Sequence, residues 1–270
     1  MTLAIGLVNP EGIVMAADSR QSYRHAAVRI GSDSAIKVFT LTDTVVAATS
    51  GYAFLRPQNA ASAQNISTLV EDFKPTLPPT PTVLQVATAL HAYFSTIYAQ
   101  HIVHVPGEAV PAGTIAIQFI VAGYDQGSRV GELFECNVPG APPVAAARTS
   151  NNAGPWWIGQ NDVAGRVYNG FDGRIINLPF VQAAHQAGQA LPQLHQLMYV
   201  VRWHTMTLQD AIDFVTGMIQ ITIIIQRFAD GIQMAPGGVP GVGGPIDVAV
   251  VQPDGPVAGS LGRRCTRRRP

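Results

Sequence analysis

Apolar residues in the first fifty positions form short runs separated by turn residues. The first two runs span residues 3–8 and 13–17 and are joined by the turn Asn9-Pro10-Glu11-Gly12. A second pair spans residues 35–41 and 45–49. Runs this apolar are typical of strands buried on both faces. We therefore expect two hairpins in the interior of the fold.

Helical spacing replaces this pattern after Gly51. Residues 58–73 carry apolar side chains at helix-compatible intervals, and a proline-rich break follows at residues 74–81. Residues 82–104 form a clearer helix, because their apolar positions recur near every 3.6 residues. These positions are Val83, Val86, Leu90, Phe94 and Ile97.

The second half of the chain repeats the sequence of strands followed by helices. Strands are expected at residues 114–124 and 131–137, with a short strand at 156–159 and the start of a helix at 161–168. The residues from about 170 to 205 form an insertion to which the pattern assigns no role.

A long apolar helix is expected near the end of the chain. Thr207 and Asp210 form a capping box ahead of residues 211–227. The β-branched run at 221–225 favours a strand locally, but the cap and the length favour a helix that is apolar all round and buried between layers. After a Gly/Pro loop, residues 246–251 form the closing strand. The element order predicts an α+β fold in layers.

Composition restricts the possible functions less than the hydrophobic pattern restricts the fold. The 270 residues have a formal net charge of zero, and only 13% are charged, so no global charge favours nucleic acid as a partner. The apolar run at 214–225 is short for a membrane span, and the first twenty residues lack the pattern of a secretory signal. We expect a soluble, cytoplasmic protein that makes no use of a membrane. It should form one domain over residues 1–255, followed by a basic, disordered tail at 256–270.

The sequence gives little reason to expect a metal site, a cofactor or a disulfide. Cys136 and Cys265 are two isolated cysteines, outside any metal-binding spacing. His101 and His104 are the closest histidine pair, and partly exposed helix residues explain them better than a metal site does. No metal or cofactor is expected.

The residues near the start of the chain suit an amino-terminal threonine hydrolase. If Met1 is removed, Thr2 carries a hydroxyl nucleophile and its own base, the free α-amine. A lysine cation beside that amine lowers its pKa, a carboxylate can hold the lysine, and a backbone N–H at a glycine turn can bind a developing oxyanion. The chain contains candidates for these parts in the order Thr2, Asp18, Arg20, Lys37, Gly51. Taken singly, Lys37 is equally an ordinary strand lysine and Asp18 an ordinary turn residue.

Together these motifs resemble the proteasome β-type subunits, which are N-terminal nucleophile (Ntn) hydrolases. The resemblance covers residues 2–252. It rests on the following segments: Thr2-Leu-Ala-Ile-Gly6, Gly12-Ile-Val-Met-Ala-Ala-Asp18-Ser-Arg20, Ala35-Ile-Lys37-Val with Gly51 fourteen residues after the lysine, Val121-Ala-Gly-Tyr-Asp125 with Gly131-Glu-Leu-Phe-Glu135, Met206-Thr-Leu-Gln-Asp-Ala-Ile-Asp213, and Pro245-Ile-Asp-Val-Ala-Val250.

The resemblance implies a four-layer αββα sandwich of two antiparallel sheets flanked by helices. It assigns Thr2 as nucleophile and base, with Lys37 tuning the amine and Asp18 as the ion partner of the lysine. The Gly51 N–H would form the oxyanion hole, and Arg20 would brace the loop near the site. Thr49 and Ala53 would line the pocket for the substrate side chain before the cut.

The chain departs from the family around this centre. The family has a serine beside a glycine before its third helix, where this chain reads Gly159-Gln160-Asn161, so that Gln160 or Asn161 would supply the polar group. After the fourth helix, Asp230 is displaced from the usual Arg-Asp pair and lacks the serine that follows it. Asp230 is equally an ordinary helix-end carboxylate. The insertions between Asp18 and Lys37 and at 170–205 resemble a divergent bacterial proteasome-like branch more than a standard 20S subunit.

The resemblance implies a threonine peptidase that cleaves peptides or unfolded proteins through an acyl-ester on Thr2. Such subunits assemble into homo-oligomeric rings, and a ring-forming ATPase partner is compatible with that assembly. Two alternatives stay open. One is an Ntn amidase or transpeptidase acting on a small amide, and the other is a structural ring subunit without catalysis.

Overall fold

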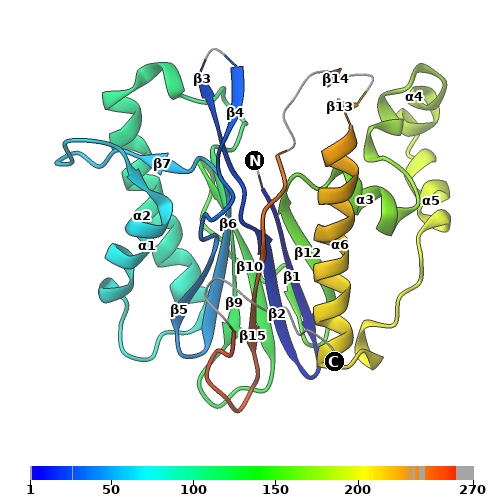
Figure 1. Ribbon diagram of the computed structural model, residues 1–270. Helices are drawn as coiled ribbons and strands as arrows, with labels where there is room; N and C mark the ends of the chain where they lie inside the picture. Colours follow the sequence, from blue (N-terminus) through cyan, green and yellow to red (C-terminus); the bar gives the residue numbers. More distant parts are fainter. Residues whose placement is uncertain (1, 26, 230, 233–234, 237–240, 260–270) are drawn as a thin grey trace, which may run out of the picture.

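Two antiparallel sheets lie face to face in the middle of the molecule, with helices on both outer sides (Figure 1). The computed structural model describes residues 2–25, 27–229, 231–232, 235–236 and 241–259. Met1, Asp230 and Cys265 lie outside the described residues, as do residues 260–270 of the predicted tail.

The first sheet holds both ends of the domain. Its strands run in the order β12-β1-β2-β15, and each neighbouring pair is antiparallel. Their bounds are β1 Leu3–Asn9, β2 Gly12–Asp18, β12 Gly154–Gly159 and β15 Ile246–Val251. Every residue of β1 and β2 is buried, which confirms the expected burial on both faces.

The second sheet has the strand order β11-β10-β9-β6-β5 and is also antiparallel. Its bounds are β5 Val38–Thr42, β6 Val45–Gly51, β9 Ile117–Tyr124, β10 Gly131–Val138 and β11 Arg148–Thr149. Strands β5 and β9 therefore begin three residues later than the sequence pattern predicts. Residues 33–37 form an irregular segment that leads into β5.

Helices form the two outer layers (Figure 1). On the second sheet lie α1 Ile66–Phe73 and α2 Val83–His104, and on the first sheet lie α3 Asp162–Asn169 and α6 Leu208–Phe228. The insertion at 170–205 holds α4 Pro179–Gln186 and α5 Ala190–Leu194 beyond α3. Short 3-10 helices lie at Lys74–Thr76, Pro106–Glu108, Gly173–Asn177, His195–Leu197 and Trp203–Thr205. The layers thus follow the predicted αββα order.

Small hairpins fill the remaining insertions. The residues added between Asp18 and Lys37 contain β3 Gln21–His25 paired with β4 Ala27–Ser32. Strand β7 Phe54–Leu55 pairs with β8 Gln64–Asn65, and β13 Gly231–Ile232 pairs with β14 Ala235–Pro236.

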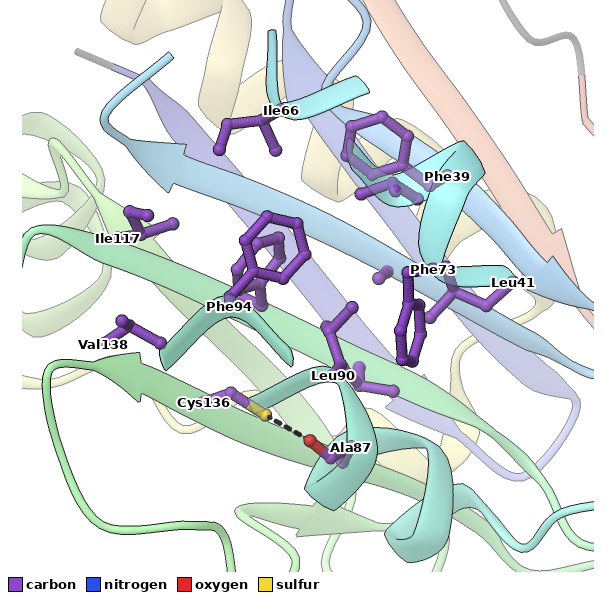
Figure 2. Close-up of a cluster of buried hydrophobic side chains, with 14 of the residues drawn as sticks. Phe39, Leu41, Ile66, Phe73, Ala87, Leu90, Phe94, Ile117, Cys136 and Val138 are labelled. Carbon is purple, nitrogen blue, oxygen red and sulfur yellow. Dashed lines mark hydrogen bonds between the residues drawn. The ribbon is translucent and has the colours of Figure 1, made fainter. Parts of the chain in front are cut away.

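Apolar side chains hold the layers together in three clusters. One lies between α1, α2 and the second sheet, where the Phe94 and Phe119 rings stand 4.6 Å apart. Figure 2 shows this cluster, including the Cys136 thiol that donates to the Ala87 carbonyl oxygen at 3.5 Å. The second cluster lies between the sheets, and the third lies between the first sheet and α6.

The predicted helix at residues 58–73 is wrong over its first half. Helix α1 begins only at Ile66, because the Asn65 side chain caps it by accepting a hydrogen bond from the Ser67 N–H at 2.9 Å. The residues before Asn65 instead form the β7–β8 hairpin. Apolar spacing alone did not reveal this cap, since Asn caps helices and ends hairpins equally well.

The expectation that the last helix is buried all round is also wrong. One face of α6 packs on the first sheet through Ala211, Val215 and Ile219, but Ile224 and the 80% exposed Phe228 face outward. The helix has 21 residues, and by length and composition it is long enough to cross a membrane. Its inner face has the position of a core helix.

Truncating a core aromatic should destabilise the fold without touching the site. Phe94→Ala removes a fully buried ring from the cluster under α2, and we expect it to cost about 3 to 5 kcal/mol of unfolding free energy. The control is Val103→Ala on the same helix, where the side chain is 78% exposed and the cost should stay within about 0.5 kcal/mol. Urea unfolding measures both variants, and similar losses would contradict the core assignment.

Candidate active site

A buried ion pair joins the end of β2 to the segment before β5. The Lys37 Nζ lies 3.2 Å from Asp18 Oδ2, and both side chains are almost fully buried. Lys37 Nζ also donates to the backbone carbonyl oxygen of Arg20. The pattern of the chain predicts this pair, and the structure brings the two residues together.

The Asp18 carboxylate accepts hydrogen bonds from backbone N–H groups as well as from the lysine. Its Oδ1 accepts the Leu3 N–H at 3.0 Å, and its Oδ2 accepts the N–H groups of Arg20 at 3.1 Å and Gly243 at 2.9 Å. One carboxylate therefore holds the first peptide after Thr2, the turn after β2, the lysine and the segment before β15. Hydrogen bonds of this kind favour the ionised carboxylate.

Burial and pairing act against each other at this site. Burial is the largest influence on the pKa of Asp18 and raises it, while Lys37 and the N–H groups of Gly243 and Leu3 oppose the rise. Burial likewise lowers the pKa of Lys37 from its ordinary value, against the attraction of Asp18. A lysine with a lowered pKa exchanges protons more readily near neutral pH than an exposed lysine does.

Thr2 lies at the start of β1, next to this pair. It is buried, and its carbonyl oxygen accepts the Gln160 N–H at 2.7 Å. Gly159 has a φ of +83°, and a Cβ there would stand 2.0 Å from the Thr2 carbonyl oxygen. Only glycine permits so close an approach, and the turn after β12 therefore fixes the backbone of Thr2.

The predicted residues share one cleft. It is lined by residues just before β1, in the turn after β2, in the segment before β5, at the end of β6 and at the start of α1. Among the predicted site residues, those that line it are Thr2, Arg20, Lys37, Thr49, Gly51 and Ala53. Asp18 lies behind Lys37, and Gln160 meets the site through the Thr2 backbone.

Gly51 ends strand β6 at the edge of this cleft. Its φ is +103°, and a Cβ would stand 2.1 Å from the carbonyl oxygen of Ala116. The backbone therefore turns here in a way that requires glycine. The N–H of the next residue, Tyr52, donates to the same Ala116 oxygen at 3.0 Å. This turn places the Gly51 backbone on the cleft without a side chain in the way.

Arg20 and Thr49 contact protein partners rather than offering free groups. The Arg20 guanidinium binds both carboxylate oxygens of Asp33, at 2.7 and 2.9 Å. The Thr49 hydroxyl donates to the Gln118 carbonyl oxygen at 3.2 Å. The bidentate pair ties the turn after β2 to the irregular segment before Lys37, which agrees with a bracing role for Arg20.

Two polar residues near the site were not identified from the sequence. Asp247 on β15 accepts from the Ser19 hydroxyl at 3.2 Å and lies close enough to interact electrostatically with Lys37, while burial raises the pKa of Asp247. Gln226 on α6 donates from Nε2 to Gln160 Oε1 at 3.2 Å. For Asp247 a signal existed, because it is the single charged residue in the otherwise apolar run at 246–251.

The histidine pair plays a different part from the one expected. His101 is buried, not partly exposed. Its ring nitrogens have partners inside the protein, because Nδ1 accepts the Arg56 N–H at 3.1 Å and Nε2 lies 3.0 Å from Glu108. His104 is exposed. Among the residues that the structure describes, no group of three or more His, Cys, Asp or Glu side chains is placed to hold a metal ion.

Comparison with known proteins identifies the fold. No protein-family model matches the chain, and no curated protein matches it. Among solved structures, it is similar to an Anbu mutant from Hyphomicrobium sp. strain MC1, at 15% identity and a TM-score of 0.53 over 99% of this chain and 88% of that one. It is also similar to the Anbu complex from Pseudomonas aeruginosa, described as a helical assembly, at 15% identity and a TM-score of 0.60 over the same shares.

Both of these neighbours have the Ntn fold. The low identity means that this likeness shows the fold, and it confirms the predicted αββα Ntn-hydrolase architecture.

Substituting Gly51 should cost more than backbone strain alone. Gly113 is a matched control, because its φ is +80° and nothing lies within 4 Å of a Cβ there. Gly113→Ala should cost about 1 to 2 kcal/mol from the strained conformation. Gly51→Ala adds the contact with Ala116 and should cost at least about 2 kcal/mol more. Urea unfolding of both variants checks this, and equal losses would contradict the close approach.

Proposed function

We propose that this protein is a threonine hydrolase that cleaves amide bonds through an acyl-ester on Thr2, exposed by removal of Met1. The observation that supports this most is the double role of Asp18. Its Oδ2 pairs with Lys37 and its Oδ1 holds the N–H of Leu3, the residue that follows the nucleophile. The carboxylate thereby sets the position of the lysine relative to Thr2, in a fold shared with Ntn hydrolases.

The proposed reaction uses these groups in two steps. The Thr2 hydroxyl attacks the substrate carbonyl carbon and gives its proton to the α-amine of the same residue. The amine then protonates the leaving nitrogen as the C–N bond breaks, which leaves an ester on Thr2. Water activated by the amine hydrolyses this ester. The Gly51 N–H at the cleft would stabilise the oxyanion in both steps, and Lys37 would keep the amine unprotonated.

A peptide is the proposed substrate, and a homo-oligomer the proposed form. The Anbu neighbour assembles as a helical complex. Support in this chain comes from strongly exposed apolar side chains, among them Phe180 on α4, Phe228 at the end of α6 and the 96% exposed Val200. Apolar surface of this kind commonly marks contacts between subunits.

Removal of the Thr2 hydroxyl should abolish acylation. Purified protein is first weighed intact, since the proposal requires a chain that begins at Thr2. An electrophilic peptide such as an epoxyketone should then add its mass to the wild type, while Thr2→Ala should show no adduct and at least a thousandfold lower turnover of fluorogenic peptides. Thr2→Ser should keep part of the activity, because it retains a hydroxyl on the same amino-terminal residue.

The outcomes of this experiment separate the alternatives. A mature chain that retains Met1, or a Thr2→Ala variant with full activity, would refute the proposed nucleophile. Labelling without cleavage of varied peptides would favour an amidase or transpeptidase acting on a small amide. A chain that starts at Thr2 but neither labels nor turns over would leave a structural subunit.

The cleft should favour a neutral substrate side chain before the cut. The charges on its lining are compensated, because Arg20 is paired with Asp33 and Lys37 with Asp18. The other described residues of the lining are neutral. A charged substrate side chain would lose its hydration there without gaining a free partner of opposite sign. Peptides with Leu or Gln at this position should therefore be cleaved in preference to those with Asp or Lys.

A single charge at Asn65 should change this preference. Asn65 lines the cleft, caps α1 and donates to Gln21 Oε1 at 3.3 Å. Asn65→Asp keeps a good helix cap but adds a negative charge. The ratio of kcat/KM for a Lys peptide to that for a Leu peptide should rise about tenfold. The exposed cap substitution Thr207→Asp on α6 serves as control and should leave the ratio unchanged; an unchanged ratio in Asn65→Asp would refute the assignment of the cleft.

A further inference from the structure

Gln226 connects two segments that are far apart in sequence, the backbone at residues 241–242 and the side chain of Gln160. It lies near the end of α6, after the β-branched run, and its side chain is half-buried. Its Oε1 accepts the N–H groups of Gly241 at 3.0 Å and Val242 at 2.9 Å, while its Nε2 donates to Gln160 Oε1 at 3.2 Å. An uncharged amide combines acceptor and donor in one planar group, which this double contact requires.

Each of the linked segments makes a direct contact with the site. The residue after Val242 is Gly243, whose N–H donates to Asp18 Oδ2 at 2.9 Å. The backbone N–H of Gln160 donates to the Thr2 carbonyl oxygen at 2.7 Å. One side chain from the outer helix layer therefore supports both the donor to the buried carboxylate and the turn that holds the nucleophile.

Gln226 itself does not line the cleft. Its contacts are with residues that do not line the cleft themselves, so any effect on the reaction must pass through the positions of Asp18 and Thr2.

We propose that Gln226 is a positioning residue for the reaction on Thr2, and that it keeps the Gly243 N–H on Asp18 and the Gln160 turn on Thr2 at the same time. This inference rests on the proposed threonine hydrolase function. Under this inference, the neutral amide of Gln226 on α6 provides the outer support of the site.

The test compares two variants of Gln226 with a control on the same helix. Gln226→Met keeps the length and helix preference of the side chain but removes its hydrogen bonds. Gln226→Glu keeps an acceptor for the N–H groups of Gly241 and Val242. Gln220→Met makes the same chemical change at an exposed position on α6. Melting temperature and oligomer size are recorded for every variant, so that activity is compared per folded molecule.

We expect Gln226→Met to lower kcat about tenfold with an unchanged KM, because the residue lies outside the cleft. Gln226→Glu should stay within about threefold of the wild type, and Gln220→Met should match it. The acid limb of the pH profile of Gln226→Met should move to higher pH. This shift is expected because the Gly243 N–H would be held less firmly on Asp18, and losing a hydrogen bond to the charged carboxylate raises the pKa of Asp18. The other titratable groups near Asp18 are Lys37, Arg20 and Asp247, together with the α-amine of Thr2 that acts as base in the proposed mechanism. None of these groups is replaced in this variant.

Hydrogen exchange gives a readout that does not depend on turnover. The amides of residues 241–243 should exchange faster in Gln226→Met than in the wild type, with no change in Gln220→Met.

Other results would overturn the inference. A Gln226→Met protein with wild-type kcat and pH profile, or one that loses only melting temperature, would reduce Gln226 to a structural contact while leaving the threonine mechanism intact. A wild-type protein that neither labels nor turns over would refute the proposed function itself, and the inference with it.

Discussion

The candidate site depends on the buried carboxylate of Asp18. An ionised group with almost no exposure is stable only when donors replace its lost hydration. Here one ammonium and three backbone N–H groups do so, and they come from the starts of β1 and β5, the turn after β2 and the segment before β15. The same contacts that make the charge tolerable also bring together four parts of the chain that are far apart in sequence. Removing the carboxylate would leave Lys37 buried without its ion partner, a change that is strongly destabilising.

The layered core explains why these contacts are held in place. Asp18 ends the central strand β2, between β1 and β15, with Ile246 as its partner in the ladder. Both faces of β1 and β2 are covered, by the second sheet on one side and by α6 on the other. Because a slip of one residue would turn every side chain to the opposite face, the register that buries the strands also fixes where Asp18 and Thr2 stand.

The centre of the site could be predicted from the sequence, and its support could not. Thr2, Asp18, Lys37 and Gly51 occur in an order that their chemistry makes recognisable, and strong apolar runs place the first three beside buried strands. The contact between Gln226 and Gln160 requires α6 to lie beside a turn 66 residues earlier in the chain. No local sequence pattern predicts such a contact. The same limit explains α6 itself. Periodicity identifies an apolar helix. Whether the face that carries Ile224 is covered depends on elements far away in the sequence, which local periodicity does not reveal.

The support that reaches the site from α6 is neutral. Gln160 and Gln226 form an amide pair that spans the distance from α6 to the start of β1. A carboxylate in the place of Gln226 would keep the acceptor for Gly241 and Val242 but would lose the donor to Gln160 and add a charge. A shorter hydroxyl side chain in the place of Gln226 would have fewer bonds to offer than the amide, which serves two backbone N–H groups and a second amide at once. Neutral amides thus confine the charge near Thr2 to Asp18, Lys37 and their close neighbours. The balance between Asp18 and Lys37 is then the main electrostatic influence on Thr2.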